Sequence, residues 1–152
     1  MMRKTMLGLG LATLAACSAA PGNDTAKAPD DAAILIARIK PATVSGKSWT
    51  PAGISLTANA WRWAETGGES GDREVSLTPR DLVSPSSVER NSDFWEVRFK
   101  CAKPGCISIE DKGGEEQVDS ISWKFAEKDD ATIAGRVANA LLLEHGATRR
   151  TY

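Results

Sequence analysis

The chain has 152 residues, of which 41% are hydrophobic and 26% charged, and its 19 basic residues nearly balance its 20 acidic residues. This composition is typical of a globular protein. It lacks the basic cluster that nucleic-acid binding requires, so we expect no nucleic-acid partner. The same balance excludes a strong electrostatic attraction to an anionic membrane surface.

The first residues have the organisation of an export signal. A positive start at Arg3-Lys4 precedes an apolar run over residues 6–16, and Cys17 follows directly. A positive segment, an apolar core and a small-residue cleavage region are the parts of a secretory signal. Because the run is shorter than the roughly 20 residues that a membrane-spanning helix needs, we interpret it as a signal and not as an anchor.

Leu14-Ala15-Ala16-Cys17 resembles the lipobox of bacterial lipoproteins. The resemblance covers residues 1–17 and implies that the chain is cut before Cys17, which is then acylated and holds the protein at a membrane. By the habit of that family, Ser18 in place of aspartate permits transfer to the outer membrane of a cell with two membranes. An ordinary secretory signal with an incidental cysteine is the alternative. Cleavage lowers the count of Lys and Arg from 19 to 17 against 20 acidic residues, a net charge of −3.

The remaining chain divides into a tether and one domain. Residues 18–33 are rich in Ala, Pro, Gly, Asp and Asn and hold almost no large apolar side chain. Such a segment buries too little surface to offset the entropy of ordering it, so we expect a flexible tether. The expected organisation is therefore a signal peptide at 1–16, a lipidated cysteine and tether at 17–33, and a single globular domain at 34–152.

The first half of the domain predicts a short helix and then strands. Pro29-Asp30-Asp31 provides a helix start before an apolar segment over residues 34–39. From Trp49 the pattern has period two. Its apolar side changes before Trp61 and Trp63, which predicts a bulge or sharp bend near residue 60. Glycines at 65–72 predict a turn, and short strands follow at 75–77 and 81–88.

The second half predicts the clearest strands. In residues 94–101 one face carries Trp95, Val97, Phe99 and Cys101, and the other carries Glu96, Arg98 and Lys100. We expect Ile107 and Ile109 in the antiparallel return strand. A later strand places Ile121, Trp123 and Phe125 inward and Ser120, Ser122 and Lys124 outward.

The chain ends with a predicted amphipathic helix. Asp129-Asp130 can cap a helix from Ala131, and Gly146 can stop it. One apolar stripe recurs at helical intervals: Ile133, Ala134, Val137, Ala138, Leu141 and Leu142. The whole predicts a mainly β (α+β) fold, an antiparallel β roll or open barrel of about six to seven short strands that this helix caps. The element order over roughly residues 50–146 resembles the pleckstrin-homology-like roll, and other helix-capped small barrels or sandwiches are the alternative.

Cys101 and Cys106 flank a Pro104-Gly105 turn. In an exported protein a close pair is most simply a disulfide, here at a hairpin tip, with free thiols or a catalytic or metal-binding pair as alternatives. One conflict remains in the pattern. If the cysteines lie opposite each other, Ile107 falls on the face away from Phe99, which a bulge beside Cys106 would reconcile.

The chemistry-bearing residues favour binding over catalysis. His145 is the only histidine and sits in the last turn of the predicted helix, where an imidazolium meets the negative end of the helix dipole. We interpret the acidic pairs Glu115-Glu116 and Asp129-Asp130 as solvated or capping groups, with acid–base catalysis as the alternative. We therefore expect no enzyme, no cofactor and no metal site.

The five tryptophans are the unusual feature of the composition. Trp95 and Trp123 fall on inward faces and are expected in the core. Trp61 and Trp63, on either side of Arg62, belong either to the core or to a surface for a partner or ligand. The leading hypothesis is a lipid-anchored, non-catalytic domain that binds another envelope component. Its alternatives are a carrier of a small apolar ligand and a hydrolase that uses acidic residues.

Overall fold

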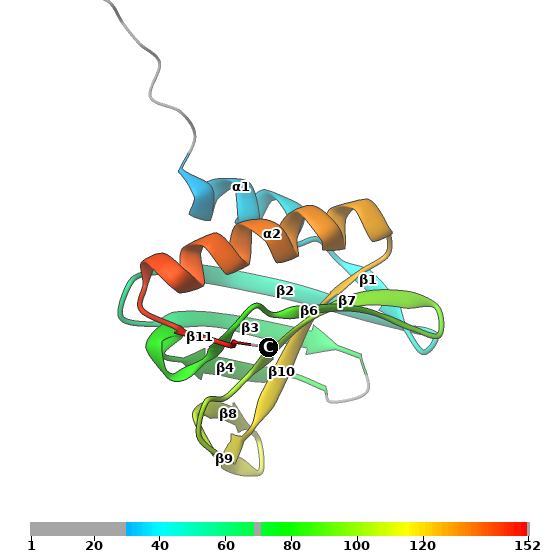
Figure 1. The fold of residues 1–152 in the computed structure, drawn as a ribbon. Helices are drawn as coiled ribbons and strands as arrows, with labels where there is room; N and C mark the ends of the chain where they lie inside the picture. The colour runs from blue at the N-terminus through cyan, green and yellow to red at the C-terminus, as the bar shows by residue number, and fades with distance from the viewer. Residues whose placement is uncertain (1–29, 69–70, 152) are drawn as a thin grey trace, which may run out of the picture.

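The computed structural model describes residues 30–68 and 71–151 (Figure 1). Its elements, in chain order, are α1 (Asp31–Arg38), β1 (Ala42–Val44), β2 (Lys47–Leu56), β3 (Trp61–Gly67), β4 (Arg73–Leu77), the 3-10 turn η1 (Pro79–Asp81), β5 (Val83–Ser84), β6 (Ser87–Asn91), β7 (Phe94–Lys100), β8 (Ile107–Asp111), β9 (Gly114–Val118), β10 (Ser120–Phe125), α2 (Lys128–Glu144) and β11 (Thr148–Arg149). The expected start of the domain at residue 34 lies inside α1, so residues 31–33 are helical.

The strands form three sheets. One is antiparallel with the order β1-β2-β3-β4-β8-β9, a second has the order β10-β7-β6, and β11 pairs in parallel with β5. Over the described residues the large sheet keeps two free edges and does not close into a barrel. Figure 1 shows α2 lying across the sheets with α1 beside it. The prediction of a mainly β fold capped by a C-terminal helix is confirmed, whereas the expected number of strands was too low.

Both predicted helices are present, but α2 begins at Lys128, three residues before the predicted start at Ala131. The carboxylate of Asp30 accepts a hydrogen bond from the Ala32 amide at 3.2 Å and caps α1. Asp129 and Asp130 lie in the first turn of α2 and do not cap it, because the N-cap residue is Glu127. Oδ1 of Asp130 instead accepts a hydrogen bond from Nη1 of Arg38 on α1 at 2.8 Å, and this ion pair links the two helices. The chain then leaves α2 through Gly146, whose φ of 88° confirms the predicted stop.

Of the two predicted causes for the change of apolar side near residue 60, the sharp bend is confirmed and the bulge is not. Residues 57–60 form a tight turn in which Thr57 and Ala60 exchange hydrogen bonds of 3.0 and 3.1 Å. Trp61 therefore begins a new strand, and the parity changes because the turn intervenes. The irregularity that does interrupt the β2–β3 ladder lies earlier, between Ala52 and Ser55.

The predicted hairpin between residues 94–101 and 107–109 is wrong. β7 pairs with β10 and β6, whereas β8 pairs with β4 and β9. Residues 101–106 therefore carry the chain from the three-stranded sheet to the six-stranded sheet. Ile107 and Ile109 lie opposite Leu77 and Val75, not opposite Phe99. The conflict of faces around Cys106 disappears, because the two strands share no sheet and need no common register.

The core is built around aromatic side chains from both larger sheets. Trp123 stacks on Trp61 with ring centroids 5.8 Å apart, and Trp63 and Phe99 meet it edge-on at 5.4 and 4.6 Å. The helix α2 covers this core with small residues. A Cβ on Gly135 would lie 2.6 Å from Cγ2 of Val88, so glycine permits the close approach of α2 to β6.

Candidate functional site

The predicted lipidation residue, Cys17, lies outside the described residues. Trp61 and Trp63 are 0% and 2% exposed, so both belong to the core and the alternative of a partner surface made by them is wrong. Arg62 lies between them in β3 and points to the opposite, solvent-facing side, as alternation along a strand requires. Burial of the two tryptophans follows from the β2–β3 turn, which the sequence pattern did not resolve.

Cys101 and Cys106 form a disulfide, as predicted, with Cα atoms 5.6 Å apart. Its place differs from the expected hairpin tip. The bond lies at the base of the segment over residues 101–119, which leaves the three-stranded sheet, forms the β8–β9 hairpin and returns as β10. Asp119 closes the same base, because its carbonyl accepts from the Cys101 amide at 2.9 Å and its carboxylate accepts from the Gly105 amide at 2.6 Å.

His145 lies at the C-terminal end of α2, as predicted, but makes a contact that the sequence did not indicate. Its Nδ1 accepts a hydrogen bond from the indole N–H of Trp61 at 3.3 Å. The residue therefore serves as an acceptor for a core side chain, and this bond uses the ring nitrogen's lone pair. Over the described residues, no three His, Cys, Asp or Glu side chains gather as metal ligands would.

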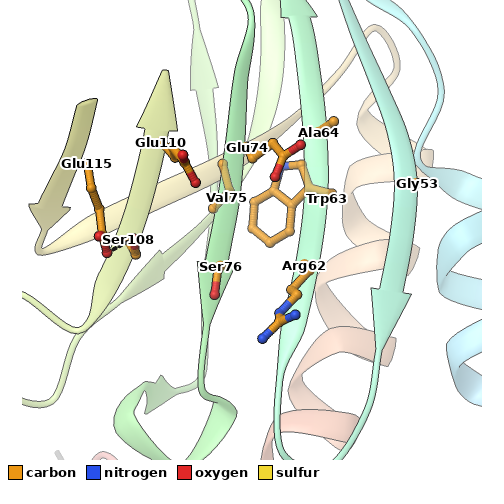
Figure 2. Close-up of a pocket in the computed structure, with 10 residues that line it drawn as sticks. All are labelled: Gly53, Arg62, Trp63, Ala64, Glu74, Val75, Ser76, Ser108, Glu110 and Glu115. Atoms are coloured by element: carbon orange, nitrogen blue, oxygen red, sulfur yellow. Dashed lines mark hydrogen bonds between the residues drawn. The ribbon is translucent and has the colours of Figure 1, made fainter. Parts of the chain in front are cut away.

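A hollow of about 470 Å³ lies on the outer face of the six-stranded sheet, and its lining residues are drawn in Figure 2. Strand register puts Glu110 directly opposite both Glu74 and Glu115, so three carboxylates form one row across β4, β8 and β9. Like charges in such positions repel, but all three side chains are exposed and water screens them. Ser108 donates to Glu115 at 2.6 Å. We interpret this row as the solvated face of an antiparallel sheet.

A second cavity, of about 240 Å³, lies where the two larger sheets meet. We call it the ionic pocket and define it by five of its lining residues, Trp49, Glu65, Arg73, Glu96 and Lys124. Two cross-strand pairs build it. Glu65 on β3 is in register with Arg73 on β4, and Glu96 on β7 is in register with Lys124 on β10. Each larger sheet thus contributes one acidic and one basic side chain.

Glu65 is 2% exposed and is held at both carboxylate oxygens. The indole N–H of Trp63 donates to Oε1 at 2.8 Å, and Nε of Arg73 donates to Oε2 at 2.9 Å. The Arg73 side chain is itself only 14% exposed, so this is a buried ion pair with charge-assisted hydrogen bonding. Both groups are fixed before any ligand arrives.

Glu96 is held in the same way from the other sheet. It is 4% exposed, Arg98 donates to Oε1, and the Ser122 hydroxyl donates to Oε2 at 2.9 Å. All four oxygens of Glu65 and Glu96 therefore already accept hydrogen bonds. Within the ionic pocket the acidic groups are therefore held in place by hydrogen bonds from the protein itself.

Lys124 is held differently. Its ammonium donates only to the backbone carbonyl and hydroxyl of Ser122, at 3.2 and 3.5 Å, and lies 5.5 Å from the centroid of the Trp49 ring. Among the described residues no carboxylate oxygen lies within 4.0 Å of it. Burial lowers the pKa of Lys124 below its usual range, the carboxylates of Glu65 and Glu96 oppose that effect, and the nearby guanidinium groups add to it.

The sequence did not indicate the ionic pocket. Glu96 and Lys124 lie on the polar side of their strands, as predicted, whereas Glu65, predicted in a turn, lies within β3. The error was to equate the polar side with solvent. A signal was nevertheless present in the sequence. The charged residues at 96, 98 and 124 lie between aromatic residues, an unusual setting for side chains that face solvent.

No helix in the described part of the chain has the length and apolarity needed to cross a membrane. Searches against protein-family models, curated proteins and solved structures each found no match to this chain.

Proposed function

We propose that this chain is a lipid-anchored protein of the cell envelope whose folded domain binds another molecule and does not catalyse a reaction. The anchor is the expected acyl group on Cys17, and the expected place is the periplasmic side of the outer membrane. The support for the anchor is the order of a positive start, an apolar run and Leu14-Ala15-Ala16-Cys17. The support for the outer membrane is Ser18, in place of aspartate, after the cysteine.

The observation that carries the binding role is the ionic pocket. Its walls come from strands of both larger sheets, and hydrogen bonds within the protein already fix its acidic groups. A rigid, preorganised cavity with a small number of placed polar groups is what ligand recognition requires.

The geometry gives less support to the two alternatives. A carrier of an apolar ligand needs space between sheet and helix, and the indoles of Trp61, Trp63 and Trp123 fill that region. A hydrolase needs one carboxyl group to donate a proton and another to accept one. Glu65 and Glu96 share the ionic pocket, and each of their oxygens already accepts a hydrogen bond. Glu74, Glu110 and Glu115 share the hollow of Figure 2, where all three are exposed and solvated.

The anchor is tested by expressing the full chain, a Cys17→Ser variant and a matched Ser18→Ala control in a bacterium with two membranes. We expect the wild type and the control to sediment with membranes, and intact-mass analysis to find an acylated cysteine as the mature amino terminus. The Cys17→Ser chain should be exported and folded, as judged by circular dichroism, but released. A Cys17→Ser chain that still sediments, or a wild-type sulfur without lipid, would contradict the proposal.

The binding role is tested by cross-linking the wild-type protein in native envelopes. We expect one specific envelope component to be recovered with the anchored form. Its absence after cross-linkers of several lengths and chemistries would count against a binding role.

A further inference from the structure

The ionic pocket holds two acidic and two basic side chains, but the direct ion pairs leave one of its cations without a bonded partner. Arg73 neutralises Glu65, and Arg98 neutralises Glu96, each through a direct hydrogen bond. Glu89 also approaches Arg98, at 3.9 Å, but its side chain is 43% exposed and solvent screens it. Among the described residues Lys124 makes no direct ion pair, although Glu96 lies opposite it across β7 and β10. Partial burial of an unpaired ammonium is unfavourable, so its retention here needs a cause.

Several hydrogen-bond donors of the pocket also have no partner among the described residues. Arg73 uses Nε for Glu65, and its two terminal nitrogens have no hydrogen-bond partner among the described residues. The indole nitrogen of Trp49 is buried and likewise has no partner in the described chain. Its Cδ1, bonded to that nitrogen, lies beside Gly68 at the pocket rim, where an added Cβ would be 3.6 Å away. Buried donors of this kind normally find an acceptor.

We propose that the ionic pocket binds one oxyanion, a carboxylate or phosphate group of a ligand, through Lys124, the terminal nitrogens of Arg73 and the indole N–H of Trp49. An oxyanion supplies a direct ion-pair partner for Lys124 and several acceptor oxygens for the unbonded donors. The planar fork of Arg73 suits the two oxygens of such a group. A cation is disfavoured by the arginines, and an apolar group would leave the same donors unsatisfied.

This inference rests on the proposed binding role and names the chemistry of the ligand. Inorganic phosphate and acetate serve as probes, titrated separately against the folded domain at constant ionic strength in chloride. The readouts are the NMR signals of the Trp49 indole N–H and the Arg73 Nε–H. The Trp123 indole N–H is an internal control, since it is equally buried and unpartnered but does not line the pocket.

Lys124→Met removes the charge and keeps an apolar stem of similar length. Lys128→Met is the matched control, because the Lys128 ammonium lies over Trp95 at 5.4 Å, much as Lys124 lies over Trp49 at 5.5 Å, but outside the pocket. Lys124→Arg keeps the charge and should retain binding. The relative affinities for acetate and phosphate then distinguish a carboxylate ligand from a phosphate ligand.

We expect saturable shifts of the Trp49 and Arg73 signals with at least one probe, and none of the Trp123 signal. Lys124→Met should weaken binding about tenfold or more, and Lys128→Met should leave it within about twofold. The wild-type titration decides the matter even if Lys124→Met fails to fold. No saturable shift with either probe, or equal affinity in the wild type and Lys124→Met, would overturn the inference. An envelope component could instead cross-link equally to the wild type and to Lys124→Met while neither protein responds to the anions. That result would refute the role of the pocket and leave the proposed function in place.

Discussion

The buried pair of Glu65 and Arg73 should make the domain sensitive to a change of one atom. In Glu65→Gln the amide keeps one oxygen and turns an NH₂ group toward one of its two donors, Trp63 Nε1 at 2.8 Å or Arg73 Nε at 2.9 Å. Removing one partner of a buried ion pair costs about 3–5 kcal/mol, since the other charge stays buried. A domain of this size has a free energy of unfolding of about 5–15 kcal/mol. The variant should therefore lose a large part of its stability and still fold.

Urea unfolding followed by tryptophan fluorescence, with the disulfide intact, measures this loss. Glu110→Gln is the control, because Glu110 is exposed between two other glutamates and its neutralisation should change stability by less than about 0.5 kcal/mol. Glu65→Leu combined with Arg73→Met removes both charges and should cost much less than the sum of the two single changes. If the free energy of unfolding of Glu65→Gln lies within about 0.5 kcal/mol of the wild-type value, the ion pair of Glu65 and Arg73 does not stabilise the pocket.

Two further predictions concern Lys124 and Gly67, which also line the ionic pocket. Because the folded-state pKa of Lys124 lies below its ordinary value of 10.5, the unfolded chain binds more protons in the interval just below that value, and the free energy of unfolding should rise with pH there. Lys124→Met should abolish this rise in urea titrations stepped upward in pH, and an identical slope in both proteins would contradict the burial of the ammonium. Gly67→Ala should cost more than about 2 kcal/mol in thermal unfolding, because φ is +77° and the new Cβ would lie 2.0 Å from the Ser48 carbonyl oxygen. Gly53→Ala, at φ +60° with no atom within 4 Å, should cost only about 1 kcal/mol, and equal losses at both positions would show that the close approach to Ser48 is unimportant.

The elements with strong periodicity could be predicted from the sequence because the period itself defines a buried face. The apolar stripe of α2 and the alternation in β10 belong to this group, and the buried residues there include the expected Ala134, Ala138 and Leu142. Strand partners could not be predicted in the same way. A short Pro-Gly connection normally joins two strands of one hairpin, and here it joins two sheets. β9 was missed because Gly114–Val118 is almost entirely exposed and polar, so it shows no apolar alternation.

For the candidate site, the sequence predicted a covalent bond but not a cavity. The spacing of Cys101 and Cys106 is sufficient for a disulfide, since it depends on a local turn. The ionic pocket depends on residues from five strands, whose side chains meet only after both sheets are assembled. Period-two alternation shows that Glu96 and Lys124 share a side of their strands. It does not show that the neighbouring sheet covers this side.

The position of the disulfide has a mechanical consequence for the β8–β9 hairpin. This arm is inserted between β7 and β10, yet β8 is hydrogen-bonded along its whole length to β4 of the other sheet. The covalent link and Asp119 fasten both strands of the arm where they emerge. A force that separates the β8–β9 hairpin from β4 therefore also acts on the paired ends of β7 and β10. The β8–β9 hairpin therefore connects the two larger sheets, and this connection opposes the sliding of one sheet against the other.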